Sequence, residues 1–302
     1  MSQTQSNNIL ITGASGMIGS ALVEHLSKCG FTVYLLSRHA TDVPFYFEAD
    51  LRRVHLDPSI PLLAVINLAG PSIADKRWSE GRKREILDSR QQLTHALATA
   101  LAESDNKPRS FLSASAIGYY GATGKSGANE ESPLGSDFLA EVAQAWEEAT
   151  APAEAAGINT IHLRFGIVLS SDGGVLKKLL LPFKLGLGGP IGNGQQSMSW
   201  ISITDVMLII HKLIVDSPAC GPVNLVAAQP ISNLDFSADL GQALHRPHFM
   251  PLPGFMVKLL FGEMGEALLL DSSRVTSNKL SQLGIQLEHP TLHPALTALL
   301  NP

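Results

Sequence analysis

The sequence has 302 residues, of which 45% are hydrophobic and 16% charged, so the chain can bury a large core and disorder is not expected. Its net charge is −5, from 22 Lys+Arg against 27 Asp+Glu, with no block of like charges. This balance gives no electrostatic footprint for nucleic acid or for an anionic membrane surface. We therefore expect a small-molecule substrate as the partner, and the sequence leaves the oligomeric state open.

The segments that could indicate export, a membrane span or a metal site are all weak. The polar stretch 1–8 precedes a short strand and does not resemble a signal peptide. The longest apolar stretches, 206–210 and 213–215, fall short of the roughly 20 residues of a membrane span. Cys29 and Cys220 lie far apart without metal-ligand spacing, so neither a disulfide nor a metal site is expected. We expect a cytoplasmic protein with two reduced structural cysteines.

Short apolar runs alternate with helix-period stretches from residue 8 to about residue 168, which is typical of repeated βαβ units. The runs that predict strands cover residues 9–11, 32–36, 65–68, 111–113 and 161–165. The stretches that predict helices cover residues 18–28, 93–101 and 138–156. The expected fold class is α/β, a Rossmann-type doubly wound parallel sheet, with a dinucleotide-binding domain over residues 1–170.

The pattern changes after about residue 169, where a glycine-rich loop covers residues 186–194. Beyond this loop the sequence predicts helices at 204–215 and 233–245 and a strand at 223–226. We assign residues 171–302 to a smaller C-terminal substrate-side lobe, with part of 200–245 returning to the main fold. The segment from about 251 to 299, split by glycines and Pro290, is expected to form a small cap.

The strongest motif is a glycine loop, Thr12-Gly13-Ala14-Ser15-Gly16-Met17-Ile18-Gly19, which follows the first predicted strand and opens the first helix. In that context Gly13 allows the tight turn, Gly16 lets the backbone approach a pyrophosphate, and Gly19 lets the helix pack on the strand. The alternative is a glycine-rich turn without a ligand. The spacing Gly-x-x-Gly-x-x-Gly resembles that of the extended short-chain dehydrogenase/reductases.

Cofactor choice depends on the end of the second strand, where an NAD site has an acidic residue for the ribose 2′-hydroxyl. Here the chain reads Ser37-Arg38-His39. A guanidinium at that place would pair with a 2′-phosphate, and such a bond is worth about 1.5–3 kcal/mol. The sequence therefore favours NADP(H), the alternative being an exposed Arg38 without a partner.

The resemblance also implies a catalytic Tyr with a Lys four residues later and a Ser upstream, and the first two are missing. The residues four positions after the four tyrosines are Arg38, Asp50, Thr123 and Gly124. The Ser-rich segment from Ser113 to Gly121 remains, with Ser115 as the best match to the catalytic Ser. The expected Tyr and Lys positions fall on or near Phe138 and Val142. We expect Tyr119 or Tyr120 to supply the proton, the alternative being packed aromatics.

Further segments extend the resemblance to most of the chain. They include Asn67-Leu68-Ala69-Gly70, Ala74-Asp75-Lys76-Arg77-Trp78, Ser89-Arg90, Leu163-Arg164-Phe165-Gly166, Ser199-Trp200-Ile201 and Arg246-Pro247. Together they resemble an atypical, epimerase-like branch of that superfamily, sometimes labelled cell-division inhibitor SulA, from about residue 8 to 299. Two positions depart from its pattern, because Gln195 replaces the usual Arg and Ser202 the usual His.

The expected binding residues follow from the glycine loop, the second strand and the resemblance. The cofactor is expected to contact Thr12, Gly13, Ser15, Gly16, Met17, Ile18, Gly19, Ser37, Arg38, Leu68, Ala69, Gly70 and Arg90. The substrate is expected to contact Arg77, Trp78 and Trp200, for which surface or core roles are the alternative. Arg164, inside an apolar strand, needs Asp205 or a ligand phosphate as partner. Glu130 and Glu131 read as a solvated surface.

Two functions remain open at this point. The first is an NADP-dependent oxidoreductase or epimerase that acts on a nucleotide sugar or a similar polar molecule. The second is a cofactor-binding regulatory protein with weak or no turnover, which the missing Tyr and Lys favour. The fold alone does not decide between them, because function depends on the site.

Overall fold

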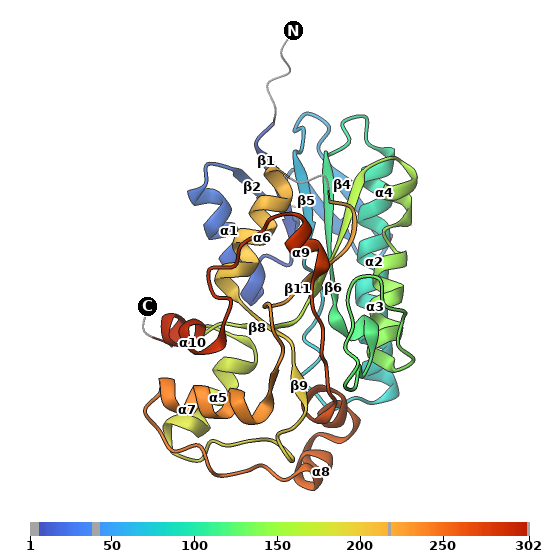
Figure 1. The fold of residues 1–302 in the computed structure, drawn as a ribbon. Coiled ribbons are helices and arrows are strands. Elements are labelled where there is room, and N and C mark those ends of the chain that lie inside the picture. Colours follow the sequence, from blue (N-terminus) through green and yellow to red (C-terminus); the bar gives the residue numbers. More distant parts are fainter. Residues whose placement is uncertain (1–5, 38–42, 217–218, 301–302) are drawn as a thin grey trace.

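The centre of the computed structural model, which describes residues 6–37, 43–216 and 219–300, is a six-stranded parallel sheet (Figure 1). The strand order is β11-β7-β6-β5-β1-β2, and every neighbouring pair is parallel. The strands are β1 (Asn8–Thr12), β2 (Thr32–Leu35), β5 (Ala64–Asn67), β6 (Ser110–Ala116), β7 (Asn159–Phe165) and β11 (Gly221–Leu225). The predicted Rossmann-type sheet is confirmed.

Helices cover both faces of the sheet, which explains why its strands read as continuous apolar runs. On one face lie α1 (Met17–Lys28) and α6 (Ile203–Val215), whose Leu22 and Ile209 join Ile9 in one buried cluster. On the other lie α2 (Glu80–Glu103), α3 (Phe138–Glu148) and α4 (Ala151–Ala155). Leu97 of α2 packs there with Leu10.

The structure differs from the predicted elements at several places. Helix α2 begins at Glu80, well before residue 93, because Ser79 caps it. The predicted helix over 138–156 divides into α3 and α4, with Pro152 in the first turn of α4. The antiparallel hairpin of β3 (Phe45–Glu48) and β4 (Arg53–Leu56) was not predicted, and neither was α5 (Gly174–Lys184).

A smaller lobe lies beyond the carboxyl ends of the sheet strands, where the chain continues from β7 and β11 (Figure 1). Its helices are α5, α7 (Asn233–Ala243), α8 (Gly254–Gly265), the π-helical turn η2 (Glu266–Leu270) and α10 (Leu292–Leu300). Its short strands are β8 (Ile167–Leu169) paired with β10 (Trp200–Ser202), and β9 (Ser197–Met198) paired with β12 (Ile231–Ser232). Phe183, Trp200 and Phe236 form its buried core. Helix α9 (Asn278–Gln282) packs back against β11.

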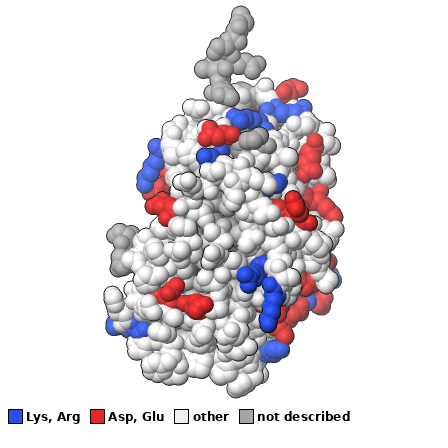
Figure 2. Space-filling view, in the orientation of Figure 1, with Lys and Arg blue, Asp and Glu red and all other residues white. Residues whose placement is uncertain are grey.

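The surface carries charges of both signs. On the face shown in Figure 2, lysines, arginines and acidic residues are interspersed near the rim, and the middle is largely uncharged. Within the described ranges, the helices are too short or too polar to cross a bilayer.

A fully buried carboxylate, Asp205, joins α6 to the C-terminal segment. Its oxygens accept hydrogen bonds from Ser202 Oγ at 2.6 Å and from the backbone N–H of Glu288 at 2.6 Å and of His289 at 3.3 Å. The Ser202 hydroxyl in turn caps the helix by accepting from Asp205 N–H. Asp205 therefore serves two segments that are 83 residues apart in the chain.

We predict that Asp205→Ala lowers the free energy of unfolding by at least about 2 kcal/mol more than Asp235→Ala. Each buried donor left without an acceptor costs about 1–3 kcal/mol, whereas an exposed helix cap is worth about 1 kcal/mol. Asp235 makes the same Ser-x-x-Asp cap on α7, but it is exposed. Urea unfolding of both variants measures the difference, and equal losses would contradict the anchoring role.

Candidate functional site

The glycine loop between β1 and α1 contains two glycines at which the described backbone leaves no space for a side chain, and a third at which a Cβ would make one close contact. Gly13 has φ of +70°, and a Cβ there would lie 2.7 Å from the backbone of Leu68. A Cβ on Gly19 would lie 2.3 Å from the carbonyl oxygen of Gly13. A Cβ on Gly16 would meet only that oxygen, at 3.3 Å. Among the described residues, Gly16 is therefore the least constrained by its neighbours of the three glycines.

The amino end of α1 is suited to an anion. Gly16 is its N-cap and offers no side-chain cap, and the first turn holds no acidic residue. The N–H groups of that turn therefore lack side-chain acceptors, and the positive end of the helix dipole faces outward. Ser79, Asp137, Ser202 and Ser232 cap α2, α3, α6 and α7, whereas α4, α5 and α8 share the absence of a side-chain cap with α1. Among these uncapped helices, α1 is the one that follows the glycine loop. The geometry fits a phosphate group at this loop.

Buried polar side chains fix the neighbouring strand ends. Thr12 Oγ1 donates to Asn67 Oδ1 at 2.7 Å and accepts from Leu68 N–H and Ala69 N–H, both at 3.2 Å. Asn67 Nδ2 donates to Thr94 of α2 at 2.8 Å. The backbone after β5, where cofactor contacts are expected, is therefore held to the end of β1.

Arg90 places a buried positive charge beside this backbone. Its guanidinium donates to the carbonyl oxygens of Ile86 and Pro71, at 3.1 and 2.9 Å, and lies 4.8 Å from the ring centre of Trp146. A Cβ on Gly70 would lie only 3.1 Å from its Cζ. Burial, and then the charge of Arg82, lower the pKa of Arg90 to about 10, so it stays charged at neutral pH. Within the described ranges no carboxylate pairs with it, which favours an anionic ligand nearby.

The remaining expected cofactor residues lie around the same loop. Ser37 follows β2 and exchanges backbone hydrogen bonds with the β3 strand, donating to Phe45 and accepting from Phe47. The Met17 side chain lies against Gly173, just before α5. Ser15 is exposed at the loop, and Ile18, in the first turn of α1, packs against the buried core. Arg38, on which the NADP(H) prediction depends, lies outside the described residues.

A second polar network lies under the carboxyl ends of β6, β7 and β11. Arg164 donates to both oxygens of Glu147, at 2.7 and 2.8 Å, and to the hydroxyl of Tyr120 at 2.8 Å. Ser115 Oγ donates to the same carboxylate at 2.6 Å, and Tyr120 donates to Asn224 Oδ1 at 2.8 Å. Burial acts to lower the pKa of Arg164, but hydrogen bonds and charge from Glu147 outweigh it and raise that pKa.

This network corrects two expectations. The partner of Arg164 is Glu147 rather than Asp205, which is engaged with the C-terminal segment. Glu130 is not a simply solvated residue, because it accepts from Asn224 N–H at 3.1 Å and from Asn278 N–H at 2.9 Å. Glu147 was not predicted from the sequence. This residue lies on the same face of α3 as the buried Ala140 and Ala143, at the spacing i, i+3, i+7, and that spacing would have identified it as a buried acid.

The two candidate tyrosines have different environments. Tyr120 is 6% exposed, and burial raises the pKa of its hydroxyl despite the nearby Arg164. Tyr119 is half-buried, and its ring lies 3.5 Å from Cζ of Arg164. Its hydroxyl makes no hydrogen bond within the part of the chain that the structure describes. Tyr119 is therefore the candidate whose proton is not already committed.

Phe138 and Val142, at the positions expected for Tyr and Lys, make packing contacts. The Phe138 ring lies 5.0 Å from that of Trp78, and Lys83 Nζ lies 5.2 Å from the Phe138 ring centre. Val142 is buried. Lys83 pairs with Glu263 of α8 at 2.7 Å, and this hydrogen bond raises the pKa of Lys83. A cleft of about 530 Å³ opens here between α2, α3 and α8.

The expected substrate residues separate into two groups. Arg77 is exposed beside α8, where a Cβ on Gly262 would lie 2.9 Å from its Nη2. Trp78 is fixed by a hydrogen bond from Nε1 to the Ile73 carbonyl at 2.9 Å. Trp200, in contrast, is 1% exposed in the core of the lobe, and this burial favours the packing alternative.

Comparison with known proteins confirms the expected family resemblance. Residues 9–225 match the NAD dependent epimerase/dehydratase family, and residues 252–299 match a domain of unknown function, DUF1731. An epimerase family protein of Mycobacterium leprae is 36% identical over 96% of this chain and 94% of its own length. The epimerase family protein YfhF of Bacillus subtilis is 33% identical over 97% of this chain and 98% of its own.

Solved structures give the same result. The human epimerase family protein SDR39U1 (isoform 2), solved with NADPH, is 31% identical and superposes with a TM-score of 0.88 over 98% of this chain and 100% of that one. UDP-glucose 4-epimerase of Thermus thermophilus, solved with NAD, is 18% identical with a TM-score of 0.74 over 96% of each chain. The second likeness supports the fold alone.

We predict that Glu147→Gln lowers the free energy of unfolding by about 3–5 kcal/mol, because it leaves the Arg164 guanidinium buried without a counter-charge. Glu148→Gln, one residue further on α3, is the control. Among the described residues Glu148 accepts only from exposed Gln144, and its loss should cost no more than about 0.5 kcal/mol. Denaturant unfolding of both variants measures the difference, and a tolerated Glu147→Gln would show that the pair is not needed.

Proposed function

Because the chain belongs to the NAD-dependent epimerase/dehydratase family, we propose that it binds NADP(H) and acts as an oxidoreductase or epimerase on a nucleotide sugar or a similar small polar substrate. The observation that carries the proposal is the uncapped amino end of α1 beside Gly16, where the protein leaves space for a pyrophosphate. The NADPH in the human relative, at 31% identity, supports the same cofactor.

The chain's own residues would hold the cofactor along the strand ends. The glycine loop from Thr12 to Gly19 would hold the phosphates, and Ser37 with Arg38 would hold the adenosine ribose and its 2′-phosphate. The backbone of Leu68, Ala69 and Gly70, with Arg90 behind it, would flank the dinucleotide. When bound, the nicotinamide supplies hydride-transfer chemistry at the carboxyl edge of the sheet.

Proton transfer then depends on Tyr119, Tyr120 and Ser115. Tyr120 donates its proton to Asn224 and Ser115 donates its proton to Glu147, so both would have to exchange a buried hydrogen bond before they could serve a substrate. Tyr119 needs no such exchange and is our preferred general acid. A positioned acid of this kind contributes about 10²–10⁴-fold to the rate.

The substrate would enter from the side of the lobe. Arg77 offers an exposed guanidinium for a phosphate or carboxylate group, and Trp78 offers a flat apolar wall. Lys83, held by Glu263, adds a second fixed cation beside Phe138. Because the charge of Lys83 is already paired with Glu263, Arg77 and the Trp78 ring are the groups that suit the charged and flat parts of a nucleotide sugar.

The second candidate function is a cofactor-binding regulatory protein with weak turnover. Phe138 and Val142 favour it, because neither a phenyl ring nor an isopropyl group can move a proton or bind a ribose hydroxyl. The hydrogen bond that Ser115 donates to Glu147 also favours the regulatory function. This candidate requires the same cofactor site but no fast chemical step.

We predict that Gly16→Val abolishes NADPH binding while the protein still folds, because the added Cβ meets the described residues only at the Gly13 oxygen, at 3.3 Å, whereas the side chain stands where the pyrophosphate must approach. Gly19→Ala is the contrasting variant. Its methyl group would lie 2.3 Å from the Gly13 oxygen, so it should lower stability by about 1–3 kcal/mol as well as impair binding. Fluorescence titration and thermal unfolding distinguish the two, and a folded Gly16→Val protein that binds NADPH normally would contradict the assignment.

We predict that NADPH binds about 10–100-fold more tightly than NADH, and that Arg38→Asp removes or reverses this preference. The reason is the charge-assisted bond between the Arg38 guanidinium and the 2′-phosphate. Arg53→Asp, on the nearby β4 strand, is a control for the general effect of charge on binding. Equal affinities in the unmodified protein would remove Arg38 from the cofactor site.

We predict that the reduction of carbonyl compounds by NADPH, or of NADP⁺ by nucleotide sugars, followed by the nicotinamide absorbance, slows at least about 100-fold in Tyr119→Phe. Tyr46→Phe, on the β3–β4 hairpin, is the matched control and should leave the rate unchanged. A fast reaction that none of Tyr119→Phe, Tyr120→Phe and Ser115→Ala slows would move the chemistry to Lys83. NADPH binding without any turnover would instead support the regulatory candidate.

A further inference from the structure

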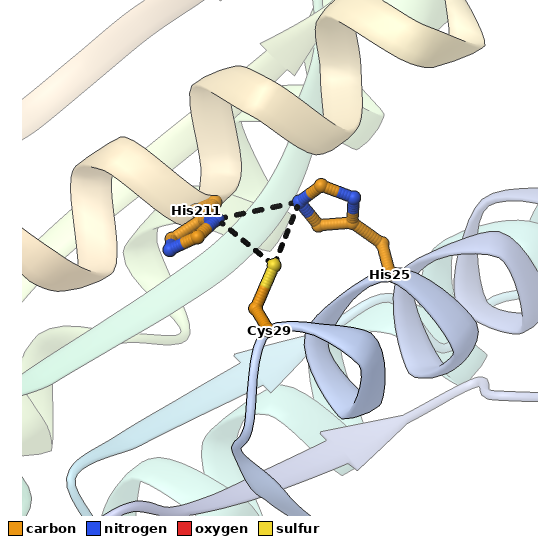
Figure 3. A group of neighbouring side chains, drawn as sticks. All are labelled: His25, Cys29 and His211. Carbon is orange, nitrogen blue, oxygen red and sulfur yellow. Dashed lines mark hydrogen bonds between the residues drawn. The ribbon is translucent and has the colours of Figure 1, made fainter.

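Three side chains that bind transition metals meet on the opposite end of α1 from the glycine loop (Figure 3). His25 lies in the last turn of α1 and Cys29 is its C-cap, so the two share one side of the helix at the spacing i, i+4. His211 extends toward them from α6, which packs against α1. The spacing of the cysteines gave no sign of this group, because Cys29 and His211 are 182 residues apart.

The distances within the group match the edges of a metal coordination tetrahedron. His25 Nε2 lies 3.3 Å from His211 Nδ1, and Cys29 Sγ lies 3.5 Å from His211 Nδ1 and 3.8 Å from His25 Nε2. Zinc binds His nitrogen at about 2.0–2.1 Å and Cys sulfur at about 2.3 Å in tetrahedral sites, which places two nitrogens about 3.3–3.4 Å apart and nitrogen and sulfur about 3.5–3.6 Å apart.

We propose that His25, Cys29 and His211 form a binding site for a transition-metal ion, with Zn²⁺ as the expected occupant. All three ligand atoms converge on one point, as Figure 3 shows, and they lie within 4.8 Å of one another. Thiolate and imidazole together are the donor set typical of zinc, whereas Mg²⁺ and Ca²⁺ require oxygen. The exposure of Cys29 leaves a fourth position for water or an external ligand.

The surroundings favour a cation at this point. The carbonyl end of α1 carries the negative end of the helix dipole, which stabilises positive charge near Cys29. The nearest cation on α1 is the exposed Lys28, which is paired with Glu24 at 2.6 Å.

A bound metal would fasten α1 to α6. Helix α1 carries the glycine loop at its other end, and α6 carries the Asp205 anchor to the C-terminal segment. The site therefore belongs to the architecture and lies away from the proposed cofactor cleft. It stands independently of the proposed function.

The test uses Co²⁺, whose thiolate complexes absorb light, on full-length protein freed of metal with EDTA and then of EDTA by gel filtration. We expect one equivalent of Co²⁺ to give a thiolate-to-cobalt charge-transfer band with the visible bands of tetrahedral cobalt, and Zn²⁺ to abolish both. Zn²⁺ should also raise the unfolding midpoint, because a ligand that binds only the folded state stabilises it.

Variants assign the signal to the three residues. Cys29→Ser should abolish the charge-transfer band, and His211→Gln should weaken Co²⁺ binding at least tenfold. Cys220→Ser removes the other exposed cysteine and should leave both properties unchanged. Circular dichroism without metal confirms folding, and His25→Gln replaces His211→Gln should the latter misfold.

Three results would overturn the proposal. The first is an unmodified protein that gives no charge-transfer band. The second is a band that survives in Cys29→Ser or disappears in Cys220→Ser. The third is Co²⁺ binding that neither His variant weakens, because a lone exposed thiol would then explain the signal.

Discussion

The charge of Arg164 constrains the structure more than any other single group, because it lies on a central strand with 3% of its surface exposed. A buried guanidinium is tolerated only when a counter-charge and hydrogen-bond acceptors surround it. Glu147 supplies the charge from α3, and Tyr120 supplies an oxygen from the turn after β6. Asn224 extends the network to β11. The need to pair the Arg164 charge therefore fixes how α3 and the turn after β6 are placed against the neighbouring strands β6, β7 and β11.

This constraint continues into the C-terminal segment and places it over the sheet. Asn224 donates to the carbonyl of Thr276 at 2.9 Å, and Glu130 binds Ser277 and Asn278 from the loop before α3. The segment that matches the domain of unknown function is thus hydrogen-bonded to the same network as the candidate catalytic residues. Its placement relative to β11 follows from buried polar contacts, which are geometrically stricter than apolar packing. The lobe and the sheet consequently share one polar interface.

Patterns in the sequence predicted the parts of the fold that depend on interactions between residues close together in the chain. The strand, glycine loop and first helix follow from the residues between Asn8 and Lys28, since Gly13 and Gly19 each meet a backbone requirement within that segment or with the adjacent strand. The sequence offered Asp205 or a ligand phosphate as the partner of Arg164 and passed over Glu147, because only the packing of α3 on the sheet brings that carboxylate to the guanidinium. Trp200 was placed at the substrate cleft for a similar reason, because an aromatic beside a glycine-rich loop looks the same in sequence whether it faces a ligand or the core.

Phe138 and Val142, at the positions where Tyr and Lys are expected, lie on a face of α3 that packs against other parts of the protein. Phe138 contacts Trp78 and lies under Lys83, and the Lys83 ammonium reaches Glu263 on α8. This face of α3 thus contacts α2 through Phe138 and Lys83, and the ion pair between Lys83 and Glu263 connects α2 to the lobe. The only candidate hydroxyl near Arg164 that is not already hydrogen-bonded within the described ranges belongs to Tyr119. Any chemistry at this edge therefore depends on the turn after β6, whose conformation is set by the same Arg164 network that organises the fold.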